Sequence, residues 1–352
     1  MDLMKNKGYR DGMRSTLPYP KHSILFAPME GITDPAYRKT VMELYPEWDM
    51  FATDFLRVPT EGSVTEKKVI EHFGEEIYNN PKLRDKTTYQ ILTTPRANTE
   101  QTLEIINGLE FNHLDLNIGC PSRRVNAHQG GSFLLTDVKL LEQVVSLIRK
   151  KTNKTFTTKI RVGFHDDKNF DDIIRCLDFC GVDGITIHGR TRVEMYKGVA
   201  QWKYFSRATK LTKLPIIANG DIWTPEDIET LFSETDVYAV MCARSAMKTP
   251  WLAREFQLKK EINYTKSKRL ANRLELLPYY FSALETNYRE AGMEDAKVLK
   301  KMKALIRYIF DDFENGDKLK SKMLRSQDYS IFMNEMTSAR SFLSQSFSFA
   351  KI

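Results

Sequence analysis

Cysteine is scarce in this chain of 352 residues, which has four: Cys120, Cys176, Cys180 and Cys242. No two of them are spaced as Cys-x-x-Cys, and they form no dense pattern. A structural zinc site and a disulfide framework are therefore both disfavoured. Chains without a disulfide framework are typical of reducing compartments, so we expect a cytoplasmic protein.

Long apolar runs are also missing, and the sequence therefore predicts no membrane-spanning helix. Residues 1–23 are polar and basic and contain several Gly and Pro, which indicates an N-terminal tail rather than a signal peptide. The six histidines have no metal-ligand spacing, so we expect no bound metal. A Gly-x-Gly-x-x-Gly turn is absent too, which disfavours a doubly wound dinucleotide-binding sheet.

The remaining composition is that of an ordinary globular protein, with 41% hydrophobic and 28% charged residues. The formal net charge is +7 at pH 7. This moderately basic balance permits a polyanionic partner without requiring one.

Eight short segments with the pattern of buried strands recur along the first two thirds of the chain. They cover residues 24–29, 50–54, 88–92, 113–118, 155–162, 184–188, 215–219 and 237–242. Helix start signals lie between them, such as Asp34-Pro35 and Thr224-Pro225, where a capping side chain precedes a proline. Eight β-α units over roughly 230 residues match the size of a (β/α)₈ barrel. We therefore predict an α/β fold, with a TIM barrel over residues 24–251.

From Leu252 onward the strand patterns stop and helical patterns follow, which predicts an all-helical domain over residues 252–352. We expect Pro278 to kink or break one helix and Gly316 to cap the end of another. The helix expected to end before Gly316 has one apolar stripe. The stripe consists of Val298, Met302, Leu305, Ile306, Ile309 and Phe313. Its other faces are rich in Lys and Arg, which in most helices is only a solvated surface.

The predicted strand His113–Ile118 leads through Gly119 directly to Cys120. In a TIM barrel, the chemistry is carried by side chains at the carboxyl ends of the strands. Cys120 is therefore a candidate for catalysis. A small apolar residue that closes a core strand is an equally open interpretation.

Two basic residues, Lys159 and Arg161, lie in an otherwise apolar strand. Burying an unpaired charge is costly, so we expect either an anionic ligand or structural ion pairs with Asp115 or Asp183.

The segment Asn219-Gly220-Asp221 follows the seventh predicted strand, and Arg244 follows the eighth. Backbone N–H groups at such a turn, together with one guanidinium, suit a phosphate. His188 is a candidate catalyst or, alternatively, a hydrogen-bonded core residue. A phosphate site, a buried cation and a thiol at one rim suit a flavin mononucleotide, which needs a cation near N1 and O2 of its ring.

Five motifs in this order resemble the tRNA-dihydrouridine synthase family in its bacterial form. They are Ala27-Pro28-Met29-Glu30-Gly31-Ile32-Thr33-Asp34, the stretch 115–125, Lys159-Ile160-Arg161, His188-Gly189-Arg190-Thr191 and Asn219-Gly220-Asp221-Ile222. The resemblance runs from about residue 24 to residue 251. It implies an FMN-binding barrel with tightly bound FMN, NADPH as the reductant, and a helical domain over 252–352 that binds tRNA. The implied reaction reduces the C5–C6 double bond of specific uridines to 5,6-dihydrouridine. We expect a monomer.

The resemblance also implies a role for each candidate residue. Cys120 would protonate C5 of the uracil. The FMN-binding residues would be Met29, Gln90, Lys159, His188, Asn219, Gly220, Asp221, Ala243 and Arg244. The substrate or RNA contacts would be Asn117, Arg123, Arg124, Arg161, Lys300, Lys301 and Arg307. An RNA enzyme of this kind must extract a stacked base, which requires a grip on nearby phosphates.

The sequence departs from the family pattern at Thr93 and Ala243, where the family has glycine. A methyl group at Ala243 crowds a position where backbone should approach phosphate closely. Two other functions stay open: an FMN-barrel oxidoreductase of a small pyrimidine, similar to dihydroorotate or dihydropyrimidine dehydrogenase, and a non-catalytic RNA-binding relative. Ribosomal RNA is an alternative substrate.

Overall fold

The computed structural model describes residues 16–259 and 266–344. Residues 1–15 of the expected tail, and residues 260–265 and 345–352 of the expected helical domain, lie outside the described part.

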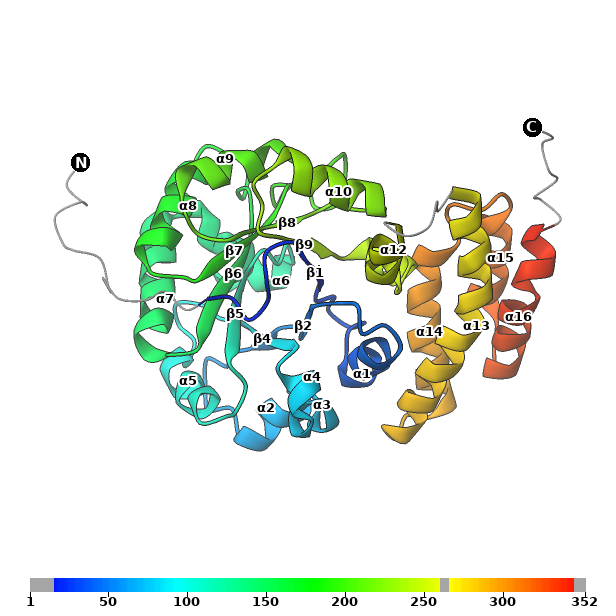
Figure 1. Cartoon of the computed structure of the whole chain (residues 1–352). Coiled ribbons are helices and arrows are strands. Elements are labelled where there is room, and N and C mark those ends of the chain that lie inside the picture. The colour runs from blue at the N-terminus through cyan, green and yellow to red at the C-terminus, as the bar shows by residue number, and fades with distance from the viewer. Residues whose placement is uncertain (1–15, 260–265, 345–352) are drawn as a thin grey trace. The chain divides into compact units, whose positions relative to one another are not determined.

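A closed parallel barrel forms the centre of the first part of the chain (Figure 1). β2 pairs with both β1 and β4, which closes the ring, and β3 is a short extra strand beside β4. The strands are β1 (Ser23–Phe26), β2 (Met50–Ala52), β3 (Leu56–Arg57), β4 (Thr87–Leu92), β5 (His113–Ile118), β6 (Thr155–Arg161), β7 (Gly184–His188), β8 (Ile216–Asn219) and β9 (Ala239–Cys242). All eight predicted strands are present, so the predicted TIM barrel is confirmed.

Helices alternate with the strands. They are α1 (Pro35–Leu44), α2 (Glu66–Phe73), α3 (Glu75–Asn79), α4 (Pro81–Arg84), α5 (Thr99–Asn107), α6 (Arg123–Ala127), the 3₁₀ helix η1 (Gly131–Thr136), α7 (Val138–Lys151), α8 (Phe170–Phe179), α9 (Lys203–Leu211), α10 (Pro225–Glu234) and α11 (Arg244–Lys248). Asp34 caps α1 by accepting a hydrogen bond from the N–H of Tyr37, and Pro35 is the first helical residue. α10 likewise begins at Pro225, so both predicted helix starts are confirmed.

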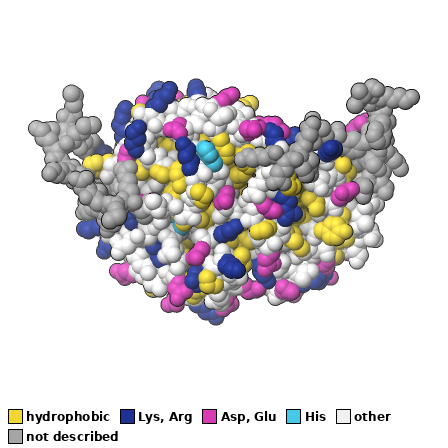
Figure 2. Space-filling model, viewed as in Figure 1, with side chains coloured by type: hydrophobic (Ala, Val, Ile, Leu, Met, Phe, Trp, Pro, Cys, Tyr) yellow, Lys and Arg dark blue, Asp and Glu magenta, His cyan; other side chains and the backbone are white. Residues whose placement is uncertain are grey.

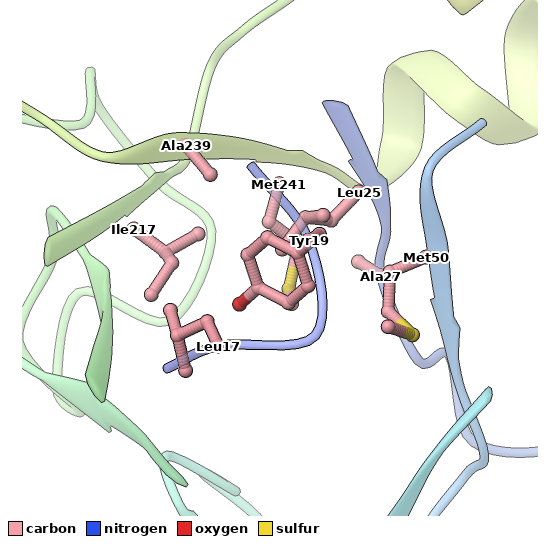
Figure 3. Close-up of a cluster of buried hydrophobic side chains, with 8 residues drawn as sticks. All are labelled: Leu17, Tyr19, Leu25, Ala27, Met50, Ile217, Ala239 and Met241. Atoms are coloured by element: carbon pink, nitrogen blue, oxygen red, sulfur yellow. The ribbon is translucent and has the colours of Figure 1, made fainter. Parts of the chain in front are cut away.

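Every second side chain of a barrel strand faces the interior. Inward side chains of β1, β2, β8 and β9 form one apolar cluster with Leu17 and Tyr19 (Figure 3), and the members from these strands are Leu25, Met50, Ile217, Ala239 and Met241. Leu17 and Tyr19 belong to the expected tail, yet each is 6% exposed. The Tyr238 hydroxyl donates a hydrogen bond to the carbonyl of Tyr19 at 2.8 Å. Residues 17–19 are therefore part of the barrel core rather than of a tail, because burying both side chains removes apolar surface from water.

The chain divides into two compact units. The first consists of residues 1–28, 48–222 and 226–243, and the second of residues 29–47, 223–225 and 244–352. Helix α1, which follows the first barrel strand in the sequence, thus groups with the C-terminal helices. Its Tyr37 hydroxyl is 2.9 Å from that of Tyr280, and Arg254 pairs with Glu47 just beyond its end. The expected boundary lay between residues 251 and 252. The second unit instead also includes residues 29–47, 223–225 and 244–251.

In the described part of the second unit, the helices that follow are α12 (Leu252–Lys259), α13 (Lys266–Glu290), α14 (Asp295–Ile309), α15 (Gly316–Arg325) and α16 (Tyr329–Ser344). The apolar stripe predicted on α14 is buried. None of the helices described within residues 16–259 and 266–344 is long and apolar enough to cross a membrane.

Two expectations about these helices are corrected. α13 does not break at Pro278, because its neighbours Leu277 and Tyr280 are at most 1% exposed and tertiary packing holds the helix together across the proline. Gly316 does not cap α14, which ends at Ile309, but begins α15. A Cβ atom at Gly316 would lie 2.0 Å from the carbonyl oxygen of Phe310, so only glycine fits this turn.

Candidate active site

Strand register brings the predicted polar residues of β4 to β8 together at the carboxyl end of the barrel. Gln90 is paired in register with Asp115, Asn117 with Lys159, and His188 with Asn219. Because alternate residues share one face, the apolar Leu114, Leu116 and Ile118 of β5 face away from the interior.

Lys159 is a half-buried cation whose Nζ donates a hydrogen bond to Oδ1 of Asn219 at 3.0 Å. Burial, together with the nearby charge of Arg161, lowers the pKa of Lys159 to about 8. The expected structural ion pairs do not form in the described part of the chain: Asp183 pairs with Arg149 at 3.0 Å, and Asp115 binds uncharged side chains. Two N–H groups of Lys159 therefore stay available for an anionic or carbonyl ligand.

Asn117 connects the barrel interior to the loop that carries Cys120. Its Nδ2 donates to Oε1 of Gln90 at 2.8 Å. Its Oδ1 accepts hydrogen bonds from the N–H groups of Gly119 at 3.0 Å and of Cys120 at 2.9 Å. Both ends of the amide are thus used within the protein, and the backbone at Cys120 is held in one conformation.

The carbonyl of Cys120 is held as firmly as its N–H. It accepts hydrogen bonds from Ser132 Oγ at 2.8 Å and from Asn126 Nδ2 at 3.2 Å. Gly131 has a φ of +57°, and a Cβ atom there would lie 3.1 Å from Cβ of Cys120, so the loop packs tightly against the cysteine. The thiol side chain is 8% exposed and contacts Leu92 and other apolar side chains. Sequence reasoning gave neither Ser132 nor Asn126 a role at the site, and Ser132 carried no signal beyond its polarity.

Arg161 is placed differently from the expected RNA contact. Its guanidinium donates to the backbone carbonyls of Gly119, Thr191 and Met195 at 2.8 to 2.9 Å. The residue is 2% exposed, and burial lowers its pKa. A side chain this deeply buried holds two loops to the barrel and is out of reach of an RNA backbone.

Asp221 is likewise engaged within the protein. Its Oδ2 pairs with Arg190 at 2.6 Å and accepts a hydrogen bond from the N–H of Ala200 at 2.7 Å. The guanidinium of Arg190 also lies 3.3 Å from Nε2 of His188. Arginine can only donate, so Nε2 of His188 is the acceptor and its proton is on Nδ1.

Gly220 has a φ of +116°, and a Cβ atom there would lie 2.8 Å from Cδ2 of His188. A side chain at this position would therefore displace the histidine ring, which explains the glycine. Of the residues expected around a phosphate, Asn219, Gly220, Asp221 and Ala243 lie in the first unit. Ala243 packs against the apolar cluster of the barrel.

Thr93, the other departure from the family pattern, is 1% exposed. Its hydroxyl lies 2.5 Å from that of Thr99 at the start of α5. The hydroxyl is therefore hydrogen-bonded within the protein and does not stand as an unsatisfied polar group.

Several candidates lie in the second unit or on the surface. The N–H of Met29 donates to Oγ1 of Thr33 at 2.9 Å, and the guanidinium of Arg244 lies 4.9 Å from the ring centre of Trp223. Lys301 pairs with Asp34 at 2.7 Å and donates to the carbonyl of Gly31 at 2.8 Å. The exposed basic candidates are Arg123, Arg124, Lys300 and Arg307.

Comparison with known proteins identifies the family of this chain. The sequence profile of dihydrouridine synthase (Dus) matches residues 25–343. The chain belongs to this family. Within the described residues of this family member, no group of three or more His, Cys, Asp or Glu could hold a metal ion.

Relatives support the same assignment. The tRNA-dihydrouridine synthase B of Shewanella oneidensis is 30% identical over 244 residues, which are 68% of this chain and 73% of the relative. The tRNA-dihydrouridine(16) synthase of Pseudomonas syringae is 31% identical over 240 residues, which are 66% of this chain and 74% of the relative. The tRNA-dihydrouridine(16) synthase of Haemophilus influenzae is 26% identical over 329 residues, which are 89% of this chain and 99% of the relative.

Among solved structures, histamine dehydrogenase from Rhizobium sp. 4-9 aligns with a TM-score of 0.51 and 12% identity, over 77% of this chain and 50% of that chain. A likeness at this identity indicates a shared barrel fold and nothing finer.

Proposed function

We propose that this dihydrouridine synthase family member reduces the C5–C6 double bond of uridine in tRNA to 5,6-dihydrouridine, with FMN bound in the barrel and NADPH as the reductant. The family match and the tRNA-dihydrouridine synthases among its relatives support the reaction. The observation that carries the assignment to this site is a cysteine held by both its N–H and its carbonyl at the end of β5.

The donors at the carboxyl end of the barrel fit a flavin. Lys159 offers two N–H groups from a half-buried cation, which is the charge that stabilises a reduced flavin ring near N1 and O2. Gln90 uses one of its two Nε2 hydrogens for Asp115 and keeps the other for a carbonyl or ring nitrogen. When bound, FMN that NADPH has reduced supplies the hydride that reaches C6 of the uracil.

Cys120 then gives its thiol proton to C5, so that one hydride and one proton saturate the double bond, and the thiolate takes a proton back from solvent. Asn117 orients the backbone of the cysteine during this transfer. Lys159 would hold the flavin and supply a positive charge to it.

Exposed basic residues bind the RNA in this proposal. On the face of the protein drawn in Figure 2, Lys and Arg side chains are interspersed with Asp and Glu rather than gathered into one basic field. The RNA contacts are therefore assigned residue by residue, to Arg123 and Arg124 on α6 and to Lys300 and Arg307 on α14. Lys301 is excluded because its ammonium is already paired with Asp34.

The test is the Cys120→Ala variant, assayed on unmodified tRNA and on free uridine. We expect flavin and tRNA binding to be retained, and dihydrouridine formation on tRNA to fall by about 10²- to 10⁴-fold, the usual contribution of a general acid. Wild-type activity in the variant would remove Cys120 from the mechanism. Equal activity of the wild type on free uridine and on tRNA would instead favour a small-pyrimidine oxidoreductase.

A further inference from the structure

A column of buried polar side chains runs through the barrel interior below Cys120, and the reaction proposed above uses only Gln90 of it. It consists of Thr88 and Gln90 on β4, His113 and Asp115 on β5, and Thr157 on β6, each at most 5% exposed. The apolar cluster that contains Tyr19 is formed by inward side chains of β1, β2, β8 and β9 (Figure 3). Buried polar groups are costly unless each finds a partner, so such a column needs a reason.

The column is one continuous hydrogen-bond chain. Thr88 Oγ1 lies 2.8 Å from Nδ1 of His113, whose Nε2 lies 3.0 Å from Oγ1 of Thr157. Thr157 Oγ1 is 2.6 Å from Oδ1 of Asp115. Gln90 Nε2 is 2.8 Å from Oδ2 of Asp115, and Gln90 Oε1 is 2.8 Å from Asn117. Asn117 then holds the N–H of Cys120.

The directions of the upper bonds in this chain are fixed from both ends, by Asp115 below and by the backbone N–H groups of Gly119 and Cys120 above. An ionised carboxylate can only accept, so Gln90 must present its NH₂ group to Asp115 and its oxygen to Asn117. Asn117 must then donate through Nδ2, which leaves its oxygen facing the backbone N–H of Cys120. If either amide turned by 180°, an NH₂ group would meet another donor.

The lower half of the chain anchors the carboxylate. Burial lowers the pKa of His113 to about 3, so the ring is neutral and carries a single N–H. Thr157 donates its proton to Asp115 and must therefore accept from Nε2–H of His113. Nδ1 of His113 is then free to accept from Thr88. Both oxygens of Asp115 are thus engaged by fixed donors.

We infer that Asp115 is a positioning residue for the reaction: as an acceptor only, it orients the amides of Gln90 and Asn117 and so holds the Cys120 loop in its productive conformation. The inference depends on the proposed role of Cys120. Asp115 does not touch the substrate; it acts through two side chains.

This role makes the position of Cys120 sensitive to acid. Asp115 faces Gln90 on β4, Thr157 and Lys159 on β6, and Tyr19 of the N-terminal segment. Burial raises the pKa of Asp115 to about 6, although its hydrogen bonds to Thr157 and Gln90 and the charge of Lys159 oppose this rise. Below that pH the carboxyl group carries a proton and can donate, so it no longer requires Gln90 to donate to it, and the support of Asn117 from below is weakened.

The experiment compares Asp115→Asn with the wild type as flavin-loaded full chains. Single-turnover dihydrouridine formation on unmodified tRNA is followed from pH 5 to pH 8.5, and flavin reduction by NADPH without RNA is followed separately. We expect the variant to form dihydrouridine at least tenfold more slowly at pH 7.5, without the wild type's fall below pH 6, while flavin reduction stays within twofold.

Asp183→Asn is the matched control, since Asp183 is also a buried barrel aspartate, 5% exposed, but pairs with Arg149 outside the column. We expect it to keep the wild-type pH profile.

A second measurement does not need turnover. A thiol-reactive aromatic disulfide, which works in acid, is used to measure the reaction rate of Cys120 relative to Cys242 by peptide mass spectrometry. In the wild type we expect the ratio to rise severalfold from pH 7.5 to pH 5, and in Asp115→Asn we expect it to be high at both pH values.

A variant with the wild-type rate and pH profile, or a wild-type ratio that does not change with pH, overturns the inference. In either case a slow Cys120→Ala variant leaves the proposed function standing. If Cys120→Ala is also fully active, it is the proposed function that fails.

Discussion

Replacing Asp115 with asparagine should stabilise the folded protein at neutral pH even though it slows the reaction. The pKa of Asp115 rises from 3.8 to about 6 on folding because the carboxylate is desolvated. A rise of about 2 pKa units corresponds to about 3 kcal/mol at about 1.4 kcal/mol per unit. At pH 7.5 the carboxylate is fully ionised in both states, so its desolvation lowers the free energy of unfolding of the wild type by this whole amount. An uncharged asparagine of the same shape does not lower it in this way.

The sign follows from proton binding. Between the unfolded and folded pKa values the folded state binds more protons than the unfolded state, so wild-type stability falls as the pH rises from about 4 to about 6. The advantage of Asp115→Asn should therefore be about 3 kcal/mol at pH 7.5 and roughly half of that at pH 5.

Urea unfolding of both proteins with the same flavin load, at pH 7.5 and pH 5, measures this difference. Asp183→Asn is again the control, and we expect it to be destabilised at both pH values, because it loses the charged partner of Arg149 and weakens the bond to the N–H of Phe156. An Asp115→Asn variant that is less stable than the wild type at pH 7.5 would refute the reasoning. It would mean that the carboxylate contributes to folding instead of opposing it.

Further predictions concern the basic residues. Lys159→Met should weaken flavin binding at pH 7 by about 10- to 100-fold, the loss of a charged hydrogen bond, and wild-type binding should weaken as the pH rises through about 8, where Lys159 loses its proton. Fluorescence titration of the flavin-free protein tests this, and an unchanged dissociation constant contradicts it. Lys300→Gln and Arg307→Gln should each reduce the slope of log K for tRNA against log salt by about 1. Lys301→Gln should leave that slope unchanged and lower stability by about 1 to 3 kcal/mol, because Asp34 loses its partner. Filter binding measures the salt slope and urea unfolding measures the stability. A Lys301→Gln variant with a reduced slope and unchanged stability would show that Lys301 contacts the RNA.

The barrel was predictable because its pattern is local. Strands such as β5 and β6 alternate apolar and polar residues at a period of two, and helices such as α1 and α10 begin at a capping residue followed by proline. The position of Cys120 at a strand end follows from the same pattern. For this reason the sequence alone was enough to predict the TIM barrel, and its motifs resembled the family to which the chain belongs.

Partners far apart in the sequence could not be predicted in this way. The buried Arg161 binds carbonyls up to 42 residues away, and Lys301 binds Gly31 across 270 residues. Pro278 stays inside α13 because tertiary packing outweighs its local preference.

The sequence by itself determined which residues could do chemistry, since residue type and strand position depend on neighbours in the chain. The tertiary structure decided which of them are committed within the protein, because the register of β4 against β5 sets the hydrogen bonds that join Asp115 and Asn117 through Gln90.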